Sequence, residues 1–584
     1  MRVLVIGAGV SGLACAEQLL RDDPHPDITI LESRRIPGGF ARSEFDESGG
    51  FYTEHSWRGY APFYRNFFDS VRLVEGIEDA FSKPLRFHLP KNAGKADAKQ
   101  LTVRDKLILG FKIARVLSAC PERQAELASK NFLDGIKHRL SEGGVDRVLG
   151  MLGPGLGLDM FRTSEYHFGK YIAATLEPAY QVSWGEKVDV FTPRDAWVTT
   201  SSPTSTSWID PWVESLRKRG VKFEFEEEVV DIRVEDSGRL VVTVESGTAE
   251  KTDEDRRRSI SVSPEKRERL VMAVSPFSAK RMLGGLRLTS ELRKLWPLTR
   301  EGPNSQISFR VSWARAIPFP SDTSVMALPD SAYNLTICPQ VRFWAEGPHP
   351  EVNARMKERG IMSLWTGTAC SCTDTLGPLF GKTAVECSIE ELKKELVWQI
   401  LECAGIRNLT GGNLDQSDIL DVEIWYEWQK GRPVDLPTPS LPAASDSGKT
   451  RRSVRSDTIP ADQVLHSTDS KWVTTCETHL HRPLQDTGIF GFVQCGAHTK
   501  TTMDLWSMEG AAESGKLASS LVLGGKAPSY IWRHGMPGIA KALGRMDSAV
   551  WSAGCPSPPF LIIVAAVVLV ALAVLAATRC ALRK

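Results

Sequence analysis

The sequence predicts an α/β fold, and three observations support it. The apolar segment 2–6 runs directly into a glycine-rich turn at 7–12, and a helical pattern follows over 11–21. A second apolar strand, 28–32, comes after that helix, so the chain opens in the β–α–β order of a parallel sheet. Near the other end, the apolar strand 488–495 leads into a helix rich in small residues. Strands and helices thus alternate at both ends of the chain.

Composition and charge exclude several classes of protein. Of the 584 residues, 42% are apolar and 24% are charged, which is typical of a globular protein with several domain-sized units. The 72 Lys and Arg residues balance the 71 Asp and Glu residues, so the chain has no electrostatic footprint for nucleic acid. The 11 cysteines lack zinc spacing, and we expect free thiols and no metal site. His479 and His481, close to Cys476, are interpreted as part of a connector.

The predicted domains are interleaved along the chain. We expect a cofactor-binding domain made of residues 1–70, 205–280 and 475–525. The remaining segments, 71–204 and 281–474, are expected to form a substrate domain of the α+β type, with mostly helical patterns in its first part.

Four other segments have distinctive patterns. Residues 221–245 alternate like antiparallel strands around an Asp-Ser-Gly turn. The charge-dense stretch 250–269 predicts a solvated loop. Residues 436–462 are rich in Pro and Ser and predict a disordered loop, and residues 526–558 are expected to be a linker.

The C-terminal segment predicts a membrane anchor. Residues 560–577 are 18 apolar residues without a charge, which as a helix would span about 27 Å. We therefore predict a transmembrane helix at 559–578, with the globular part facing the cytosol as in tail-anchored proteins. A buried core helix is the alternative interpretation. The first residues begin a strand and have no signal-peptide pattern.

The N-terminal turn has the spacing of a dinucleotide-binding loop. Gly7 permits the tight turn, Gly9 lets the backbone approach a diphosphate, and Gly12 allows the helix to pack against the strand. The diphosphate would lie at the helix N-terminus, which favours anions. Glu32 ends the second strand and would accept hydrogen bonds from ribose hydroxyls. A second glycine pair follows at 38–39, which a nicotinamide site does not need. The predicted cofactor-binding residues of this region are Gly7, Ala8, Gly9, Ser11, Gly12, Glu32, Ser33, Gly38 and Gly39.

With that second pair, the chain resembles the superfamily of flavin amine oxidases and phytoene desaturases. Its members place Gly-Gly six residues after the acidic residue, where a second backbone segment passes close to the flavin. The resemblance implies a Rossmann-type FAD-binding domain and FAD as the cofactor. The arginine usual two positions before the glycine pair is Ile36 here, with Arg34 and Arg35 beside it.

Residues 52–68 are similar to the Glu-His-Gly-x-His-Gly segment of the carotenoid desaturase and hydroxysqualene dehydroxylase branch. Glu54, His55 and Gly59 match, whereas Ser56 and Arg58 replace a glycine and the second histidine. In relatives this segment lies beside the flavin ring, so the resemblance makes His55 and Arg58 the candidate catalytic residues. A structural role for His55 is the alternative.

Two further regions carry the resemblance. Residues 220–234 are similar to the strand whose valine backbone holds the adenine, which points to Val229. Residues 495–520 follow the order of the family's closing segment, and Met508 at its helix start is expected to donate its N–H to the flavin. Gly496 matches the family, but Ala497 stands where an aspartate usually binds the ribityl chain. Small residues recur every four positions at Gly510, Ser514 and Ala518 and predict one close-packing face.

The resemblance implies an FAD-dependent oxidoreductase. We expect hydride transfer to the flavin from a lipophilic, isoprenoid- or carotenoid-like substrate, in a desaturase or dehydroxylase type of reaction at a membrane. Amine oxidation and redox-neutral isomerisation are the alternatives. The resemblance implies an aromatic pair framing the flavin in the first case, of which Trp506 could supply one member. The electron acceptor and the particular membrane are left open.

Overall fold

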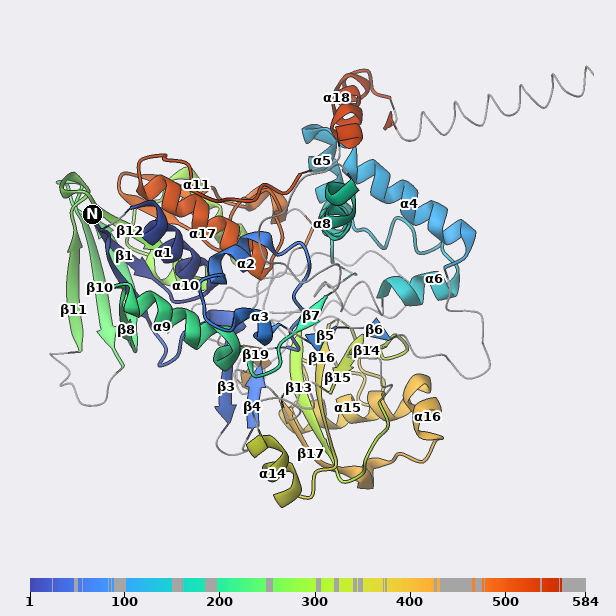
Figure 1. Ribbon diagram of the computed structural model, residues 1–584. Helices are drawn as coiled ribbons and strands as arrows, with labels where there is room; N and C mark the ends of the chain where they lie inside the picture. The colour runs from blue at the N-terminus through green and yellow to red at the C-terminus, as the bar shows by residue number, and fades with distance from the viewer. Residues whose placement is uncertain are drawn as a thin grey trace, which may run out of the picture.

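The protein is described by a computed structural model (Figure 1). The structure describes residues 1–23, 25–46, 51–54, 56–81, 83–85, 87–88, 101–149, 160, 162–183, 197–247, 256–300, 306–319, 325–339, 344, 350–370, 372, 375–424, 428–430, 465–467, 475–476, 478–535, 538–555 and 557–558.

A six-stranded, mostly parallel sheet forms the centre of the first domain. Its strand order is β20-β21-β12-β1-β2-β8, and all neighbours pair in parallel except the edge pair β20–β21. The bounds are β1 (Arg2–Ile6), β2 (Asp27–Glu32), β8 (Lys222–Phe225), β12 (Glu268–Met272), β20 (Asp486–Ile489) and β21 (Phe492–Gln494). The sheet therefore draws on three separate parts of the chain, and this confirms the expected α/β fold. The exact domain boundaries stay a prediction.

Both faces of this sheet are covered, which explains why its strands are apolar throughout. On one face, Val3 and Val5 of β1 pack with α1 (Val10–Asp22) in a large core cluster, to which α2 (Arg65–Val71) and α17 (Met508–Val522) also belong. On the other face, Leu4 and Ile6 pack with strands of a second sheet. The alternation of side chains along β1 thus divides one strand between two cores.

That second sheet corrects two expectations from the sequence. It has three antiparallel strands, β9 (Glu227–Val234), β10 (Leu240–Ser246) and β11 (Arg257–Val262), visible at the edge of the domain in Figure 1. The prediction of a solvated loop over 250–269 is wrong for β11, because the buried Val262 anchors this strand to the core while Arg257 and Arg258 stay exposed. The strand β8 does not pair with β9 but joins the parallel sheet, since Glu226 (φ 57°) turns the chain between them.

The second domain contains another six-stranded sheet, of order β17-β13-β16-β15-β14-β6. Its strands are β6 (Phe87–His88), β13 (Ile307–Trp313), β14 (Val325–Leu328), β15 (Leu335–Cys338), β16 (Ser363–Ala369) and β17 (Ile419–Ile424). The helices α15 (Ile389–Glu402) and α16 (Ala404–Thr410) lie beside it in Figure 1. Buried Trp313, Trp365 and Leu396 belong to their shared core.

The helical part of the second domain lies apart from that sheet (Figure 1). Its helices are α4 (Val103–Leu117), α5 (Pro121–Ala128), α6 (Glu142–Arg147) and α8 (Glu165–Ser183). A helix α18 (Gly538–Ser552) packs beside α5, and Asp547 forms a buried ion pair with Arg123 at 2.9 Å. Within the segment 526–558, which is expected to be a linker, residues 538–552 thus form a helix that packs against the helical part of the second domain.

Among the residues that the structure describes, no helix is both long and apolar enough to cross a membrane. The predicted transmembrane helix at 559–578 lies outside the described residues, as does the predicted disordered loop at 436–462.

Candidate functional site

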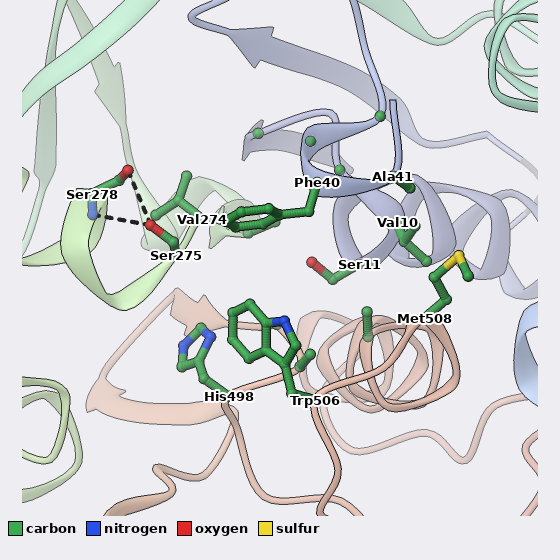
Figure 2. Close-up of a pocket in the computed structure, with 18 of the residues that line it drawn as sticks. Val10, Ser11, Phe40, Ala41, Val274, Ser275, Ser278, His498, Trp506 and Met508 are labelled. Carbon is green, nitrogen blue, oxygen red and sulfur yellow. Dashed lines mark hydrogen bonds between the residues drawn. The ribbon is translucent and has the colours of Figure 1, made fainter. Parts of the chain in front are cut away.

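A cavity of about 600 Å³ opens at the carboxyl edge of the parallel sheet. The segments that follow four neighbouring strands line it: Gly496–His498 after β21, Ala273–Ser275 after β12, Gly7 and Gly9–Ser11 after β1 and Glu32–Arg34 after β2. Figure 2 shows α1 and α17 converging on it from two directions. In open α/β sheets this edge is where ligands bind.

The first glycine turn is as tight as its sequence predicts. Gly7 has φ 101°, and a Cβ there would lie 2.6 Å from the carbonyl oxygen of Ala273. A Cβ on Gly12 would lie 2.1 Å from the carbonyl oxygen of Gly7, so only glycine lets α1 approach the turn. Gly9 precedes α1 without a side-chain cap, which leaves the amides of the first helical turn directed at the cavity. This is a site for an anion such as a diphosphate.

The second glycine pair faces the first. The N–H of Gly38 donates to the carbonyl of Ala8 at 2.9 Å, and Gly38 (φ 106°) and Gly39 (φ 54°) both adopt left-handed conformations. A Cβ on Gly39 would lie 3.3 Å from the Cα of Gly9. Two glycine backbones thus meet without intervening side chains, and together they form a cradle for a long phosphate-containing ligand.

Glu32 lies at the end of this cradle and holds part of it in place. Its carboxylate accepts hydrogen bonds from the N–H of Ala8 (2.8 Å), the N–H of Arg34 (3.0 Å) and the hydroxyl of Ser33 (3.3 Å). Burial raises the pKa of this carboxyl group. The N–H of Ala8 already donates its hydrogen bond to Glu32, so this amide is not available to a ligand. Ala8 and Gly12 are not among the residues that line the cavity. Ser33 and Val229 do line it.

The helix α17 and the loop before it form the opposite wall. The N–H of Gly496 donates to the hydroxyl of Ser514 at 3.0 Å, and Met508, the first residue of α17, lines the cavity. The predicted close-packing series Gly510, Ser514 and Ala518 is buried. Next to it, Gly515 makes a close contact with α1, since a Cβ there would lie 2.3 Å from the carbonyl oxygen of Ser11. Gly510 instead packs against the carbonyl of Leu505.

Ala497 lines the cavity and offers it a methyl group, in place of the aspartate that the resemblance leads one to expect. Its carbonyl accepts a hydrogen bond from the buried guanidinium of Arg482 at 2.8 Å. The next residue, His498, also lines the cavity and is only 2% exposed. His498 was not selected from the sequence, where the available signal was its position next to Ala497.

The other end of the cavity combines one cation with aromatic side chains. The guanidinium of Arg58 donates to the carbonyl of Phe40 and, at 3.2 Å, to the hydroxyl of Ser56. Phe40 and Trp506 meet edge to face, with ring centroids 6.0 Å apart. Trp506 is the aromatic residue that the amine-oxidase alternative named, whereas Phe40 was not selected from the sequence. The remaining lining of this end includes Trp57, Tyr64, Tyr171 and Trp197, with Gln306 and Thr368 from the second domain. The structure thus places Arg58 at the site, whereas His55 lies outside the described residues.

Comparison with known proteins supports the assignment of the fold. Residues 5–72 match the family described as NAD(P)-binding Rossmann-like domain. Among curated proteins there is no significant match. Three similar solved structures are an oxidoreductase from Methanosarcina mazei (13% identity, TM-score 0.52, 90% of this chain and 100% of that chain), a putative protoporphyrinogen oxidase from Exiguobacterium sp. 255-15 (14%, 0.51, 90% and 99%) and a putrescine oxidase redesigned in its cofactor binding (13%, 0.52, 90% and 99%).

The fold is that of these oxidoreductases. The similarity extends over nine-tenths of the chain, so the second domain shares it as well as the Rossmann-like part.

Proposed function

We propose that the chain is an FAD-dependent oxidoreductase. The observation that carries the proposal is the meeting of two glycine backbones, at Gly9 and Gly39, beside the N-terminus of α1. A nicotinamide site needs only the first of these segments, whereas a flavin dinucleotide extends past both. The similarity to solved oxidoreductases supports the same conclusion.

The residues of the cradle have distinct tasks in this proposal. The free amides at the start of α1 bind the diphosphate. Glu32 retains unused lone pairs for the ribose hydroxyls, and the backbone near Val229 contacts the adenine. Met508 directs its N–H and the positive end of the α17 dipole toward the flavin ring, where they stabilise negative charge. When bound, FAD supplies the hydride acceptor.

The far end of the cavity favours a lipophilic substrate of isoprenoid or carotenoid type. Aromatic side chains dominate there, and they orient an apolar substrate and exclude water. Arg58 is held over this end by the carbonyl of Phe40 and by Ser56. Its Nε lies 3.9 Å from the buried carboxylate of Glu54, which offsets part of its charge, and the charge that remains stabilises an electron-rich or anionic group. Desaturation or dehydroxylation of such a substrate fits this lining, and the apolar segment 559–578 would hold the protein at a membrane where the substrate dissolves.

Amine oxidation is the second candidate. The edge-to-face pair of Phe40 and Trp506 favours it, because aromatic rings can hold a neutral amine. Arg58 disfavours it, since amines are protonated in solution and meet a like charge, a repulsion that the carboxylate of Glu54, 3.9 Å from Arg58, reduces in part.

Two measurements test the proposal. The full chain, purified in detergent, should be yellow and release FAD when denatured; a colourless protein that does not take up added FAD would refute it. Anaerobic bleaching of the flavin by polyenes or squalene derivatives, and not by amines, is the expected substrate pattern. If amines alone bleach the flavin, the proposed reaction becomes amine oxidation instead of oxidation of a lipophilic substrate.

A further inference from the structure

We propose that His498 is a cofactor-binding residue: its imidazole supplies to bound FAD the polar contact for which Ala497 has no side chain. The inference rests on the proposed function, and it assigns a role that neither the glycine motifs nor the resemblance gives to this position.

The backbone holds the imidazole of His498 in a defined place. A Cβ on Gly496 would lie 2.5 Å from the Cε1 atom and 2.6 Å from the Nδ1 atom of this ring. The ring therefore packs against the bare Cα of Gly496, and only glycine leaves room for it. Figure 2 shows the imidazole beside the indole of Trp506, on the cavity side of the loop after β21. Gly496 thus has a second use beyond the turn expected from the sequence.

The imidazole also has an unmet hydrogen-bonding capacity. Its Nε2 atom is buried and, among the residues that the structure describes, has no hydrogen-bond partner. Buried polar atoms in proteins are nearly always paired, because an unpaired one loses its contacts with water and gains nothing in return. A polar ligand atom in the cavity that the ring lines satisfies this nitrogen.

The imidazole of His498 is uncharged, so it can act both as a hydrogen-bond donor and as an acceptor. Burial, and then the nearby positive charge of Arg482, lower the pKa of His498 to about 3. The ring is therefore neutral under physiological conditions and has one N–H donor and one acceptor nitrogen. The hydroxyl groups of FAD both donate and accept, and its phosphate oxygens accept. Either kind of oxygen satisfies a neutral imidazole.

The alternative is a purely structural role, in which the ring only fills space against Gly496. The two roles predict different effects of an apolar substitution at position 498 on the stability of the protein without FAD. If the ring only fills space, removing it loosens the protein without the cofactor. If its nitrogen serves the ligand, the protein without FAD carries an unpaired polar atom at a cost, and an apolar side chain of similar size relieves that cost.

The test uses His498→Leu and His498→Gln, the latter of which retains a donor and an acceptor. His167→Leu is the matched control: His167 is also buried, but it does not line the cavity, and its imidazole is held within the protein by the hydroxyl of Ser164, 3.0 Å from Nδ1, and by the backbone of Asp504. The full-length apoprotein of each variant is titrated with FAD by flavin fluorescence, and its melting temperature is measured without FAD.

We expect His498→Leu to weaken FAD binding about tenfold, which is the loss of one net hydrogen bond, without lowering the melting temperature of the apoprotein. His498→Gln should bind within about threefold of the wild type. His167→Leu should melt lower and bind FAD normally.

The inference would be overturned if His498→Leu bound FAD as tightly as the wild type. It would also be overturned if FAD affinity fell equally in both His498 variants and the melting temperature of their apoproteins was lowered. Failure of the wild-type protein itself to bind FAD would refute the proposed function instead.

Discussion

Alanine at Gly515 is expected to separate the two helices that enclose the cofactor cradle. The new Cβ would lie 2.3 Å from the carbonyl oxygen of Ser11 and 2.9 Å from the amide nitrogen of Cys15. Both atoms belong to the backbone of α1 and cannot rotate away. An ordinary contact begins at 3.4 Å, so α17 has to move away from α1 by about 1 Å.

The magnitude follows from two opposing effects. Overpacking of a well-packed core costs about 1–3 kcal/mol, whereas replacing a helical glycine by alanine gains up to about 1 kcal/mol. Because the obstacles are backbone atoms, we expect the upper part of the first range and a net loss of about 1–2 kcal/mol in the free energy of unfolding. FAD affinity should fall as well, since Met508 and Ser11 stand on the two helices that move apart.

Gly110 in α4 provides the control. It is exposed, and a Cβ there has no neighbour within 4 Å. Gly110→Ala should therefore stabilise the protein by about 0.5–1 kcal/mol through helix propensity alone and leave FAD affinity unchanged. Chemical denaturation followed by circular dichroism measures both variants. A Gly515→Ala protein as stable as Gly110→Ala would refute the argument that α1 and α17 are in backbone contact.

Three other predictions follow from the same structure. Ala497→Asp should tighten FAD binding by about tenfold or more, since a charge-assisted hydrogen bond contributes about 1.5–3 kcal/mol; unchanged or weaker binding in a fluorescence titration would mean that this residue does not face the ribityl chain. His534 lies between Glu177 (2.6 Å) and Glu509 (2.7 Å), which raise its pKa to about 10 despite burial. Because the folded-state pKa exceeds the unfolded value, its contribution is complete below about pH 6.5, and it declines as the pH rises toward 10. Melting curves across this range should show the decline in the wild type, and His534→Gln should reduce it and cost about 3–5 kcal/mol near neutral pH. Deletion of residues 559–584 should release the protein from membranes into the soluble fraction on cell fractionation; retention in the membrane pellet would contradict the anchor.

Local patterns in the sequence determined the parts of the site that depend on backbone geometry. The turn at 7–12 and the pair Gly38 and Gly39 need conformations or close approaches that only glycine permits, so they were visible without a structure. Glu32 was visible for the same reason, as the last residue of a strand in fixed relation to that turn. The edge strand β11 was missed because its exposed arginines gave it the composition of a loop.

Only the tertiary structure decided how distant segments meet. Gly515, which stands outside the predicted series Gly510, Ser514 and Ala518, makes a close contact of α17 with α1, because the helix rotation that sets this contact depends on packing. The aromatic pair of Phe40 and Trp506 joins residues 466 positions apart in the chain, and no local pattern marks either of them. The proposed role of His498 likewise depends on segments that are distant in the sequence and meet only in the fold. Its imidazole lies beside a bare Cα, next to the buried charge of Arg482 and facing a cavity, and this environment exists only once the strands of the parallel sheet have assembled.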